Sequence, residues 1–238
     1  MIDIDDQGTI RVVTLDRPDR RNALTPSGLE ALEAAVDDPP ASVIYLRGAG
    51  EAFSAGADLE AVATLADDAD EGEVEAFVRR GQRTADAIEA SSAVVVAGVD
   101  GAARGGGVEL AAACDLRIAT PQATFAEPGV TFGLFGAWGG TVRLPEIIGL
   151  GDALDLSLSG RVIDSQEAQR IGLVSRIVEE PRTVAEAIAG NDPAALEHIK
   201  TCLRSRENKR EREDGEVAAF EALVDAHADT LQELGGSL

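Results

Sequence analysis

The residues best suited to chemistry lie in two glycine-rich loops, EAFSAGADLE at 51–60 and AARGGGVEL at 102–110. Each loop follows an expected strand and leads toward a helix. Backbone N–H groups in such loops are free of Cβ obstruction, and they can point at a developing oxyanion with help from the helix dipole. Neither loop matches the GxxxxGK[ST] or GxGxxG nucleotide signatures. Each loop alone is more often just a tight turn, but the pair favours an oxyanion site.

Histidine and cysteine offer little further chemistry. The chain has two histidines, His198 and His227, which nearly excludes metal or triad chemistry built on histidine. Its two cysteines, Cys114 and Cys202, have no CxxC spacing. We therefore expect both cysteines to be buried and to pack as small apolar residues, with no disulfide or metal site.

Strands and helices in alternation must position the two loops. Apolar or alternating segments predict strands at 9–16, 43–46, 93–99, 115–119 and 173–178. Helices are expected at 27–36, at 108–113, and between an N-cap at Asp164 and a terminating Gly172. This order indicates an α/β core with right-handed crossovers, in a first domain that spans residues 1–180.

The last quarter of the chain lacks strand patterns, and residues 181–238 are expected to form an α-helical region. The helical run begins at Pro193 and has a charged break at 207–214. Positions three or four apart predict one buried face, formed by Phe220, Leu223, Val224, His227 and Leu231. That face could lie on the chain's own core or on a neighbouring subunit.

The composition is strongly acidic: 43 Asp and Glu face 21 Lys and Arg, a formal net charge of −22. Among the cations, only Lys200 and Lys209 are lysines. Because salt screens such a field over about 10 Å at 0.1 M, we interpret the charge as adaptation to a salty cytoplasm. An ordinary acidic protein would explain the charge but not the loss of lysine. Nucleic acid is disfavoured as a partner.

No apolar run approaches the roughly 20 residues that cross a bilayer, and the N-terminus has no basic, apolar leader. The expectation is a cytoplasmic protein with no membrane partner.

Five stretches together resemble the crotonase (enoyl-CoA hydratase/isomerase) superfamily, in family order and at family spacing. They are LDRPDRRNAL (15–24), FSAGADL (53–59), VDGAARGGGVELAAACDLRIAT (99–120), FGLFGAWGGTVRLPEIIG (132–149) and SGRVIDSQEAQRIGLVSRIV (159–178). The resemblance implies an α/β, crotonase-like spiral of ββα turns that binds an acyl-CoA thioester. It also implies that the C-terminal helices are a trimerisation region, which would make the chain a homotrimer or homohexamer.

The resemblance assigns an oxyanion hole to the backbone N–H groups of Ala57 and Gly106, which would stabilise a CoA enolate. Each such donor is worth on the order of 3–4 kcal/mol in related sites. Coenzyme A enters as part of the substrate, and no separate cofactor is implied. The residues that match substrate- and CoA-binding segments are Arg20, Arg21, Ala23, Ala55, Gly56, Asp58, Leu59 and Gly105. For the two arginines, surface ion pairing is the alternative interpretation.

Glu109, in GGGVEL, matches the family's first catalytic glutamate, although a carboxylate stabilised by the helix dipole is the simpler interpretation. The family's second glutamate would follow the proline of FAEPG, where this chain has Gly129, which cannot deliver a proton. Glu127 could turn toward the pocket if the segment is extended, since residues two apart then share a face. Alternatively, a water or small anion fills the space, or the reaction needs one acid.

Three functions therefore remain open. The main hypothesis is an enoyl-CoA hydratase or isomerase with Glu109 as acid/base. The alternatives are a one-carboxylate acyl-CoA decarboxylase, isomerase or thioester hydrolase, and a non-catalytic acyl-CoA-binding paralogue. Gly129 favours the alternatives over a standard hydratase, whereas the intact GADL and GGGVEL motifs favour activity.

Four further residues lie in or near these motifs. Trp138 could form a pocket wall or pack over the following helix. The role of Arg104 is left undecided. Arg143 is interpreted as structural, and Asp115 as a hydrogen-bonding residue at a strand entry.

Overall fold

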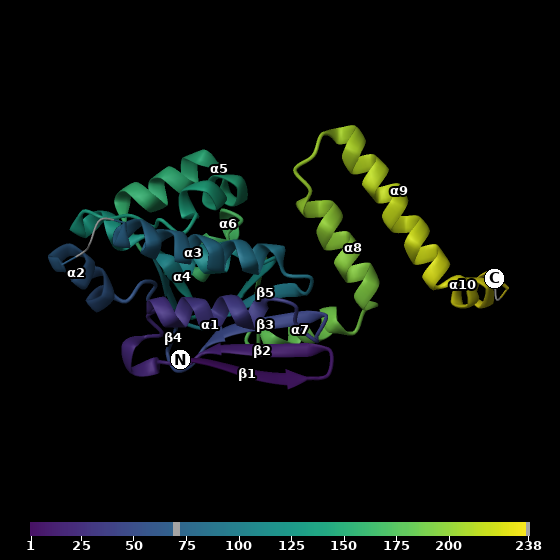
Figure 1. The fold of residues 1–238 in the computed structure, drawn as a ribbon, viewed down its shortest axis with the longest axis horizontal. Helices are drawn as coiled ribbons and strands as arrows, with labels where there is room; N and C mark the ends of the chain where they lie inside the picture. The colour runs from purple at the N-terminus through teal and green to yellow at the C-terminus, as the bar shows by residue number, and fades with distance from the viewer. Residues whose placement is uncertain (69–71, 237–238) are drawn as a thin grey trace. The chain divides into compact units, whose positions relative to one another are not determined.

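The computed structural model describes residues 1–68 and 72–236, and the chain divides into two compact units (Figure 1). Met1–Ala189 forms the first unit and Gly190–Leu238 the second. The division comes later than the expected boundary after residue 180, because α7 (Arg182–Ala189) packs against strands of the first unit.

A six-stranded sheet is the frame of the first unit. Its strands lie in the order β1 (Ile2–Gln7), β2 (Ile10–Leu15), β3 (Val43–Gly48), β5 (Val94–Val99), β7 (Leu116–Ala119) and β10 (Arg176–Ile177). β1 pairs antiparallel with β2, and the other neighbouring pairs are parallel. Every residue of β5 is buried, as expected of an apolar strand that is covered on both faces.

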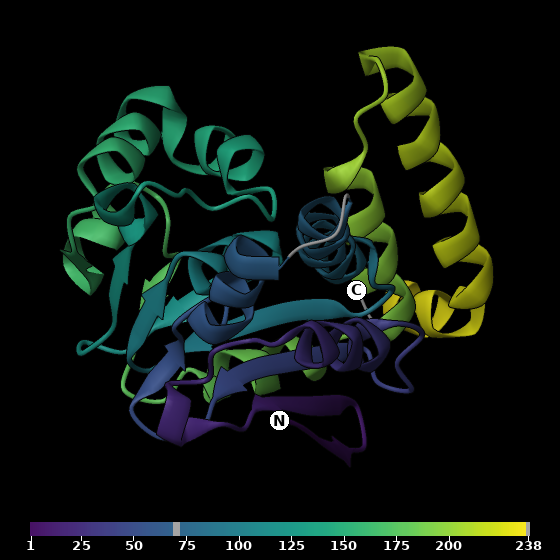
Figure 2. The same ribbon diagram turned by 60° about the vertical axis from the view of Figure 1, so that its left-hand side comes forward.

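A second sheet has the order β4 (Ala52–Ser54), β6 (Ala102–Arg104), β8 (Thr124–Ala126) and β9 (Ile163–Asp164). In chain order, β3, β5 and β7 of the first sheet are each followed by a strand of the second sheet and then by a helix. The chain therefore winds in ββα turns, as Figure 2 shows, and the spiral α/β fold predicted from the sequence is confirmed.

Helices follow the strands and cover the sheets. They are α1 (Pro26–Val36), α2 (Leu59–Asp68), α3 (Glu73–Ala90), α4 (Gly106–Ala113), α5 (Gly140–Ser159), α6 (Ser165–Arg170) and the 3-10 helices η1 (Pro18–Arg20) and η2 (Pro128–Phe132). As predicted, Asp164 caps α6, accepting the Glu167 N–H at 2.8 Å, and Gly172 has a left-handed φ of +87°. All of α4 is buried, which its small residues allow.

The apolar core reaches up to the glycine-rich loops. Phe53 and Phe125 are fully buried, and each lies on a short strand of the second sheet just before a loop. Packing of Phe53 anchors the first glycine-rich loop, and packing of Phe125 anchors the segment that carries Glu127.

The second unit consists of α8 (Pro193–Arg204), α9 (Lys209–Ala226) and α10 (Ala228–Gly236). The break expected at 207–214 is wrong in its extent, because Asn208 and Glu211 form a capping box and the charged residues that follow are helical. Cys202 is only partly buried, contrary to the expectation, whereas Cys114 is buried.

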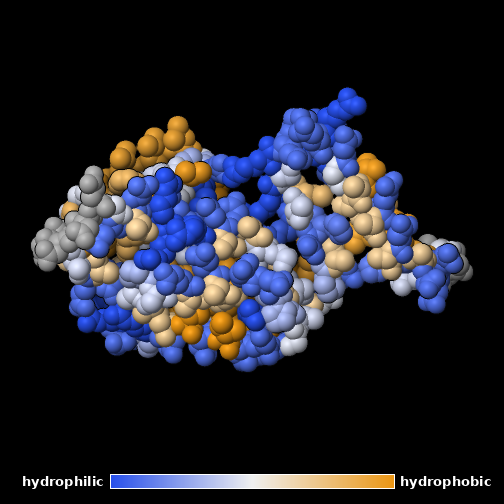
Figure 3. Space-filling view, viewed as in Figure 1, coloured by the Kyte–Doolittle hydropathy of each residue, from blue (hydrophilic) through white to orange (hydrophobic). Residues whose placement is uncertain are grey.

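The surface view in Figure 3 is largely hydrophilic, with apolar side chains gathered along α5. That helix exposes a stripe of Leu150, Leu154 and Leu158, four residues apart. Within the described residues, no helix is long and apolar enough to span a membrane.

Candidate active site

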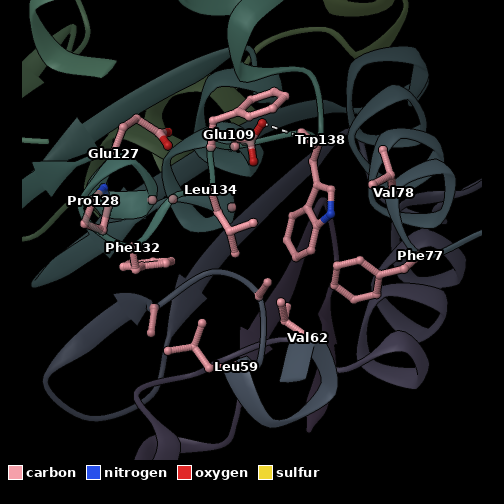
Figure 4. A pocket seen from close by; sticks show the side chains of 18 of the residues that line it. Leu59, Val62, Phe77, Val78, Glu109, Glu127, Pro128, Phe132, Leu134 and Trp138 are labelled. Atoms are coloured by element: carbon pink, nitrogen blue, oxygen red, sulfur yellow. Dashed lines mark hydrogen bonds between the residues drawn. The ribbon is translucent and has the colours of Figure 1, made fainter. Parts of the chain in front are cut away.

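A cavity of about 550 Å³ opens between α2, α3, the start of α4 and the segment around η2. Leu59 and Val62 line it from α2, and Phe77 and Val78 line it from α3 (Figure 4). Of the described lining residues, only Glu109 and Glu127 carry titratable groups. An apolar cavity with a few polar groups at one place is the usual form of a small-molecule site.

The two glycine-rich loops meet at this cavity. Gly56 has a φ of +83°, and a Cβ there would lie 2.6 Å from the Arg104 carbonyl oxygen and 2.7 Å from the Gly106 nitrogen. Glycine alone tolerates both this conformation and this approach. Gly56 therefore lets residues 55–57 lie directly against the start of α4.

The N–H groups of Ala57 and Gly106 have no hydrogen-bond acceptor among the described residues. Ala57 faces Leu24 in a parallel bridge, but the two hydrogen bonds of the bridge involve the neighbours of Ala57. The Leu24 N–H donates to the Gly56 carbonyl at 2.8 Å, and the Asp58 N–H donates to the Leu24 carbonyl at 3.0 Å. Gly106 is the first residue of α4, where an N–H has no partner within the helix. Since both residues line the cavity, two donors are available there for an oxyanion.

Glu109 lies in the first turn of α4 and is 1% exposed. Its Oε1 accepts the backbone N–H groups of Trp138 at 2.8 Å and Gly140 at 2.7 Å, which hold the carboxyl in one orientation. Burial raises the pKa of Glu109 to about 7, against the opposing effect of those two bonds and of the nearby Arg143 charge. A carboxyl with this pKa can accept or release a proton near neutral pH.

Two glycines make room for the Glu109 carboxyl. A Cβ on Gly136 would lie 2.7 Å from its Cδ, and a Cβ on Gly140 would lie 2.8 Å from its Oε1. Any larger residue at either position would displace the carboxyl. The sequence signal for this support is the repeated glycine in FGLFGAWGG, because glycine leaves space for another group, but the sequence does not say which group fills that space.

Glu127 turns into the cavity, as one of the sequence alternatives allowed. It lies between β8 and η2 and is 5% exposed, and its Oε1 has no hydrogen-bond partner within the described part of the chain. Figure 4 shows its carboxyl on the same side of the cavity as that of Glu109. Burial, and then the charge of Glu109, raise the pKa of Glu127 to about 8.

Gly129 also lines the cavity, but it has little room for a side chain. A Cβ there would lie 3.0 Å from the Leu134 carbonyl oxygen and 3.1 Å from the Phe135 Cα. The Leu134 N–H donates to the Gly129 carbonyl at 2.9 Å, which holds the two segments together. A side chain at position 129 would therefore require the backbone at 134–135 to shift by a few tenths of an ångström.

The segments expected to bind CoA are joined by backbone hydrogen bonds. The Ala55 N–H donates to the Arg21 carbonyl at 2.8 Å, and the Leu24 N–H donates to the Gly56 carbonyl at 2.8 Å. These bonds place Arg20, Arg21 and Ala23 beside Ala55, Gly56, Asp58 and Leu59.

The side chains of these segments are engaged to different degrees. The Asp58 carboxylate pairs with Arg17 and caps α2 by accepting the Glu60 N–H at 2.9 Å. Arg20 forms an exposed ion pair with Glu60 at 2.8 Å, the alternative weighed for it above. Leu59 and Gly105 line the cavity itself. Leu59 and Gly105 at the cavity and the exposed Arg21 are therefore the parts of these segments most open to a ligand, whereas Arg20 would have to share its charge with Glu60.

Trp138 forms part of the cavity wall, the first of its two expected roles, while its ring packs against α3 and the start of α4. The residue lines the cavity and is 3% exposed, and its ring packs against Phe77 with centroids 6.0 Å apart. A Cβ on Gly106 would lie 2.3 Å from the Trp138 ring. The indole therefore holds the start of α4 in place.

The remaining polar residues have structural partners. Arg143 bonds Asp86 at 2.7 Å and Glu89 at 2.8 Å, as a structural residue would. Asp115 accepts the Val95 N–H at 2.8 Å, in the strand-entry role predicted for it. Arg104, whose role the sequence did not indicate, donates to the Thr124 carbonyl at 2.8 Å.

Comparison with known proteins identifies relatives of this chain. The family profile described as enoyl-CoA hydratase/isomerase matches residues 5–233. A probable enoyl-CoA hydratase of Rhizobium meliloti is 35% identical over 86% of this chain and 79% of its own length. A crotonyl-CoA hydratase of Syntrophomonas wolfei is 38% identical over 76% of this chain and 71% of its own length.

Solved structures show the same likeness. An enoyl-CoA hydratase from Bacillus anthracis superposes with a TM-score of 0.89 at 31% identity, covering 99% of this chain and 96% of that one. One from Thermoplasma volcanium gives 0.87 at 28% identity, with 99% and 96% covered. The chain belongs to the enoyl-CoA hydratase/isomerase family of the crotonase superfamily and is an acyl-CoA enzyme of that type.

Proposed function

We propose that the chain binds an acyl-CoA thioester in this cavity and carries its reaction through an enolate, most simply as an enoyl-CoA hydratase or isomerase. The observation that carries the proposal is the pair of free N–H groups at Ala57 and Gly106 in the same apolar cavity as Glu109. Two fixed donors in a site shielded from water stabilise a developing oxyanion far better than bulk water does.

In the hydration reaction, the thioester oxygen lies between the two N–H groups. Glu109 takes a proton from a water molecule while the water oxygen bonds to C3 of the substrate. The C2=C3 electron pair moves into the thioester, and the enolate oxygen accepts the bonds from Ala57 and Gly106. A proton must then be added at C2 to complete the product.

The second candidate is a reaction that needs one carboxyl, and Gly129 favours it. Isomerisation can use Glu109 alone, which would remove a proton at one carbon and return it at another. Decarboxylation and thioester hydrolysis would also use the oxyanion hole without an acid at position 129. A non-catalytic acyl-CoA-binding paralogue would keep the cavity but show no turnover.

Several features extend the proposal beyond the cavity. Arg20 and Arg21 would meet the CoA phosphates, beside the backbone of Ala23, Ala55, Gly56, Asp58 and Leu59 that holds the rest of CoA. No cofactor beyond the CoA of the substrate is needed. Residues 181–238 would assemble a homotrimer or homohexamer. The net charge of −22 suits work in a salty cytoplasm.

The test is incubation with crotonyl-CoA in molar KCl, following loss of the conjugated enoyl absorbance. The variant Glu109→Gln keeps the size of the side chain but removes the base, so kcat should fall by about 10²–10⁴ with CoA affinity nearly intact. Glu179→Gln, at an exposed glutamate, is the matched control. Unchanged turnover in Glu109→Gln would contradict the role of Glu109.

If wild type does not hydrate crotonyl-CoA, 3-enoyl-CoA and malonyl-type CoA esters separate the remaining candidates. Turnover of a 3-enoyl-CoA supports isomerisation, and turnover of a malonyl-type ester supports decarboxylation. CoA binding without turnover of any ester supports the non-catalytic paralogue.

A further inference from the structure

The proposed hydration leaves the C2 proton without an assigned donor. The family's usual position for that acid is residue 129, which is a glycine in this chain and has no proton to give. Among the described residues that line the cavity, Glu127 is the one titratable group besides Glu109. It is also buried with an unpartnered Oε1, an arrangement that costs stability and that a purely structural residue has no reason to keep.

Glu127 also borders a second, much smaller cavity of about 20 Å³ on the side of α5. Its lining includes two hydroxyl-bearing residues, Thr141 and Ser157. A volume of roughly 10–15 Å³ on this measure is enough for one water, provided that polar partners are present. The Glu127 carboxyl and the two hydroxyls are such partners.

The small cavity shares lining residues with a larger one. Thr141 and Ser157 also line a third cavity of about 570 Å³ along α5, and Thr141 is exposed. Glu127 therefore lies between the substrate cavity on one side and a hydroxyl-lined route toward the surface on the other.

We propose that Glu127 is the acid that protonates C2 of the substrate in place of the missing residue at 129, and that it regains its proton through the small cavity by way of Thr141 and Ser157. The inference rests on the proposed function, because it supplies the second proton of the same reaction.

The proton balance closes without another reactant. Glu109 gains a proton from water as the C3–O bond forms, and Glu127 loses its proton as the C2–H bond forms. Glu127 is then reprotonated along the route past Thr141 and Ser157, and Glu109 releases its proton when product leaves. Water is thus added across the double bond, and both carboxyls return to their starting states.

The charges around Glu127 favour its neutral form. From α4, Glu109 faces it with a negative charge, and the positive charge of Arg143 on α5 is paired with Asp86 and Glu89 of α3. Residues 128–142 bring no titratable side chain. With the pKa of Glu109 at about 7 and that of Glu127 at about 8, the ionised Glu109 and protonated Glu127 coexist near neutral pH.

The first experiment compares wild type, Glu127→Gln and Glu127→Asp in crotonyl-CoA hydration across pH, with Glu179→Gln as the control. Gln keeps the shape of a neutral acid but has no proton to give, so kcat/KM should fall by about 10²–10⁴. The decrease of kcat/KM at high pH, where Glu127 loses its proton, is the alkaline limb of the pH profile, and it should disappear in this variant. Asp keeps the acid, so its variant should retain the alkaline limb at a lower rate. In D₂O, wild type should add deuterium at C2 in one configuration, and the residual product of Glu127→Gln should be mixed.

The second experiment tests the route by combining Thr141→Val with Ser157→Ala, and uses the exposed Thr9→Val as the control. Reprotonation follows the chemical step, so kcat should fall severalfold with a larger solvent isotope effect, while kcat/KM stays near the wild-type value. An unchanged kcat would overturn the route.

The outcomes separate the inference from the function on which it rests. A wild type that turns over no CoA ester overturns the proposed function and the inference with it. An active wild type with unchanged kcat/KM, alkaline limb and C2 configuration in Glu127→Gln overturns the inference alone. If Glu127→Gln does not fold, Glu127→Asp decides the matter: the inference requires a lower kcat/KM with the alkaline limb moved to the pKa of the shorter acid, whereas an unchanged rate and an unmoved limb overturn it.

Discussion

Gly136 and the carboxyl of Glu109 occupy adjoining space, so that a Cβ on the glycine would lie 2.8 Å from Oε2 of the glutamate. Gly136 has an ordinary backbone conformation, and its smallness, not its flexibility, is what the site uses. The carboxyl that the sequence places on α4 is thus positioned by a loop that lies far along the chain.

Gly136→Ala should therefore lower activity without changing any ionisable group. The new methyl pushes the Glu109 carboxyl away from the N–H groups of Trp138 and Gly140, and a misplacement of about 1 Å can cost about 10²-fold in rate. Steady-state kinetics on the active CoA ester checks this. Gly151→Ala is the matched control, because a Cβ there meets nothing within 4 Å. Equal activity in the two variants would show that Glu109 does not need its present position.

Position 106 can separate the N–H donor from the space around it. Gly106→Ala and Gly106→Pro both place a Cβ against the Trp138 ring, but only proline removes the N–H. Proline suits the first residue of a helix, so α4 should still form. We expect kcat in the proline variant to be lower than in the alanine variant by a further 10²–10³ or so. Similar rates in the two would remove Gly106 from the oxyanion hole.

Because the pKa of Glu127 is raised in the folded protein, the free energy of unfolding should depend on pH. Below the unfolded value of 4.5, both states carry the proton, and above about 8 neither does. Between these limits only the folded state keeps it, so Glu127 makes the free energy of unfolding fall as pH rises, by about 1.4 kcal/mol per pH unit, in addition to the similar effect of Glu109 below its pKa of about 7. Glu127→Gln should lose this slope and become more stable than wild type at neutral pH.

Urea unfolding between pH 4 and 9 at fixed KCl measures the effect, with Glu179→Gln in parallel. Identical slopes in wild type and Glu127→Gln would mean that Glu127 is already ionised in the folded protein at neutral pH.

The net charge of −22 predicts that salt stabilises the folded state. Raising KCl from about 0.1 M to 1 M shortens the screening length from about 10 Å to 3 Å, which weakens repulsion among the surface carboxylates. Thermal unfolding midpoints should rise by several degrees, since 1 kcal/mol corresponds to about 2–4 °C for a chain of this size. Choline chloride at equal ionic strength should act alike if screening is the cause. A midpoint that does not move with salt would contradict the halophilic interpretation.

Local patterns in the sequence were enough to place β5, α4 and the cap of α6, because each depends on residues close together in the chain. β1 was missed because IDIDDQ exposes acids along an edge strand and buries almost nothing. The three-residue strands β4, β6 and β8 are too short to show a period.

The motifs of the candidate site could be predicted from the sequence, but the contacts that hold its residues in place could not. The bonds that hold Glu109 come from residues 29 and 31 positions later, and no local pattern reports such a contact. Likewise, the sequence showed that Gly129 stands where an acid is usual, but not that the backbone of Leu134 fills the space beside it.

Gly129 supplies the last prediction, which compares three variants at one position. A Cβ at 129 must push against the Leu134 carbonyl and the Phe135 Cα, so Gly129→Ala, Gly129→Gln and Gly129→Glu should all lose activity through the same backbone shift. The difference between Gln and Glu isolates the carboxyl. If Glu127 donates the C2 proton, the Glu variant should hydrate crotonyl-CoA no faster than the Gln variant.

The same substitution in the Glu127→Gln background makes the comparison sharper. With the proposed donor removed, a carboxyl at 129 that reached C2 would restore hydration, by up to the 10²–10⁴ that general acid catalysis typically contributes. We expect no recovery, because the 134–135 backbone keeps the new side chain from the substrate. Recovery would show that the loop yields and that the family's usual acid position still faces C2. Gly129 would then be a lost donor, whereas a failure to recover means that the loop has closed over its place.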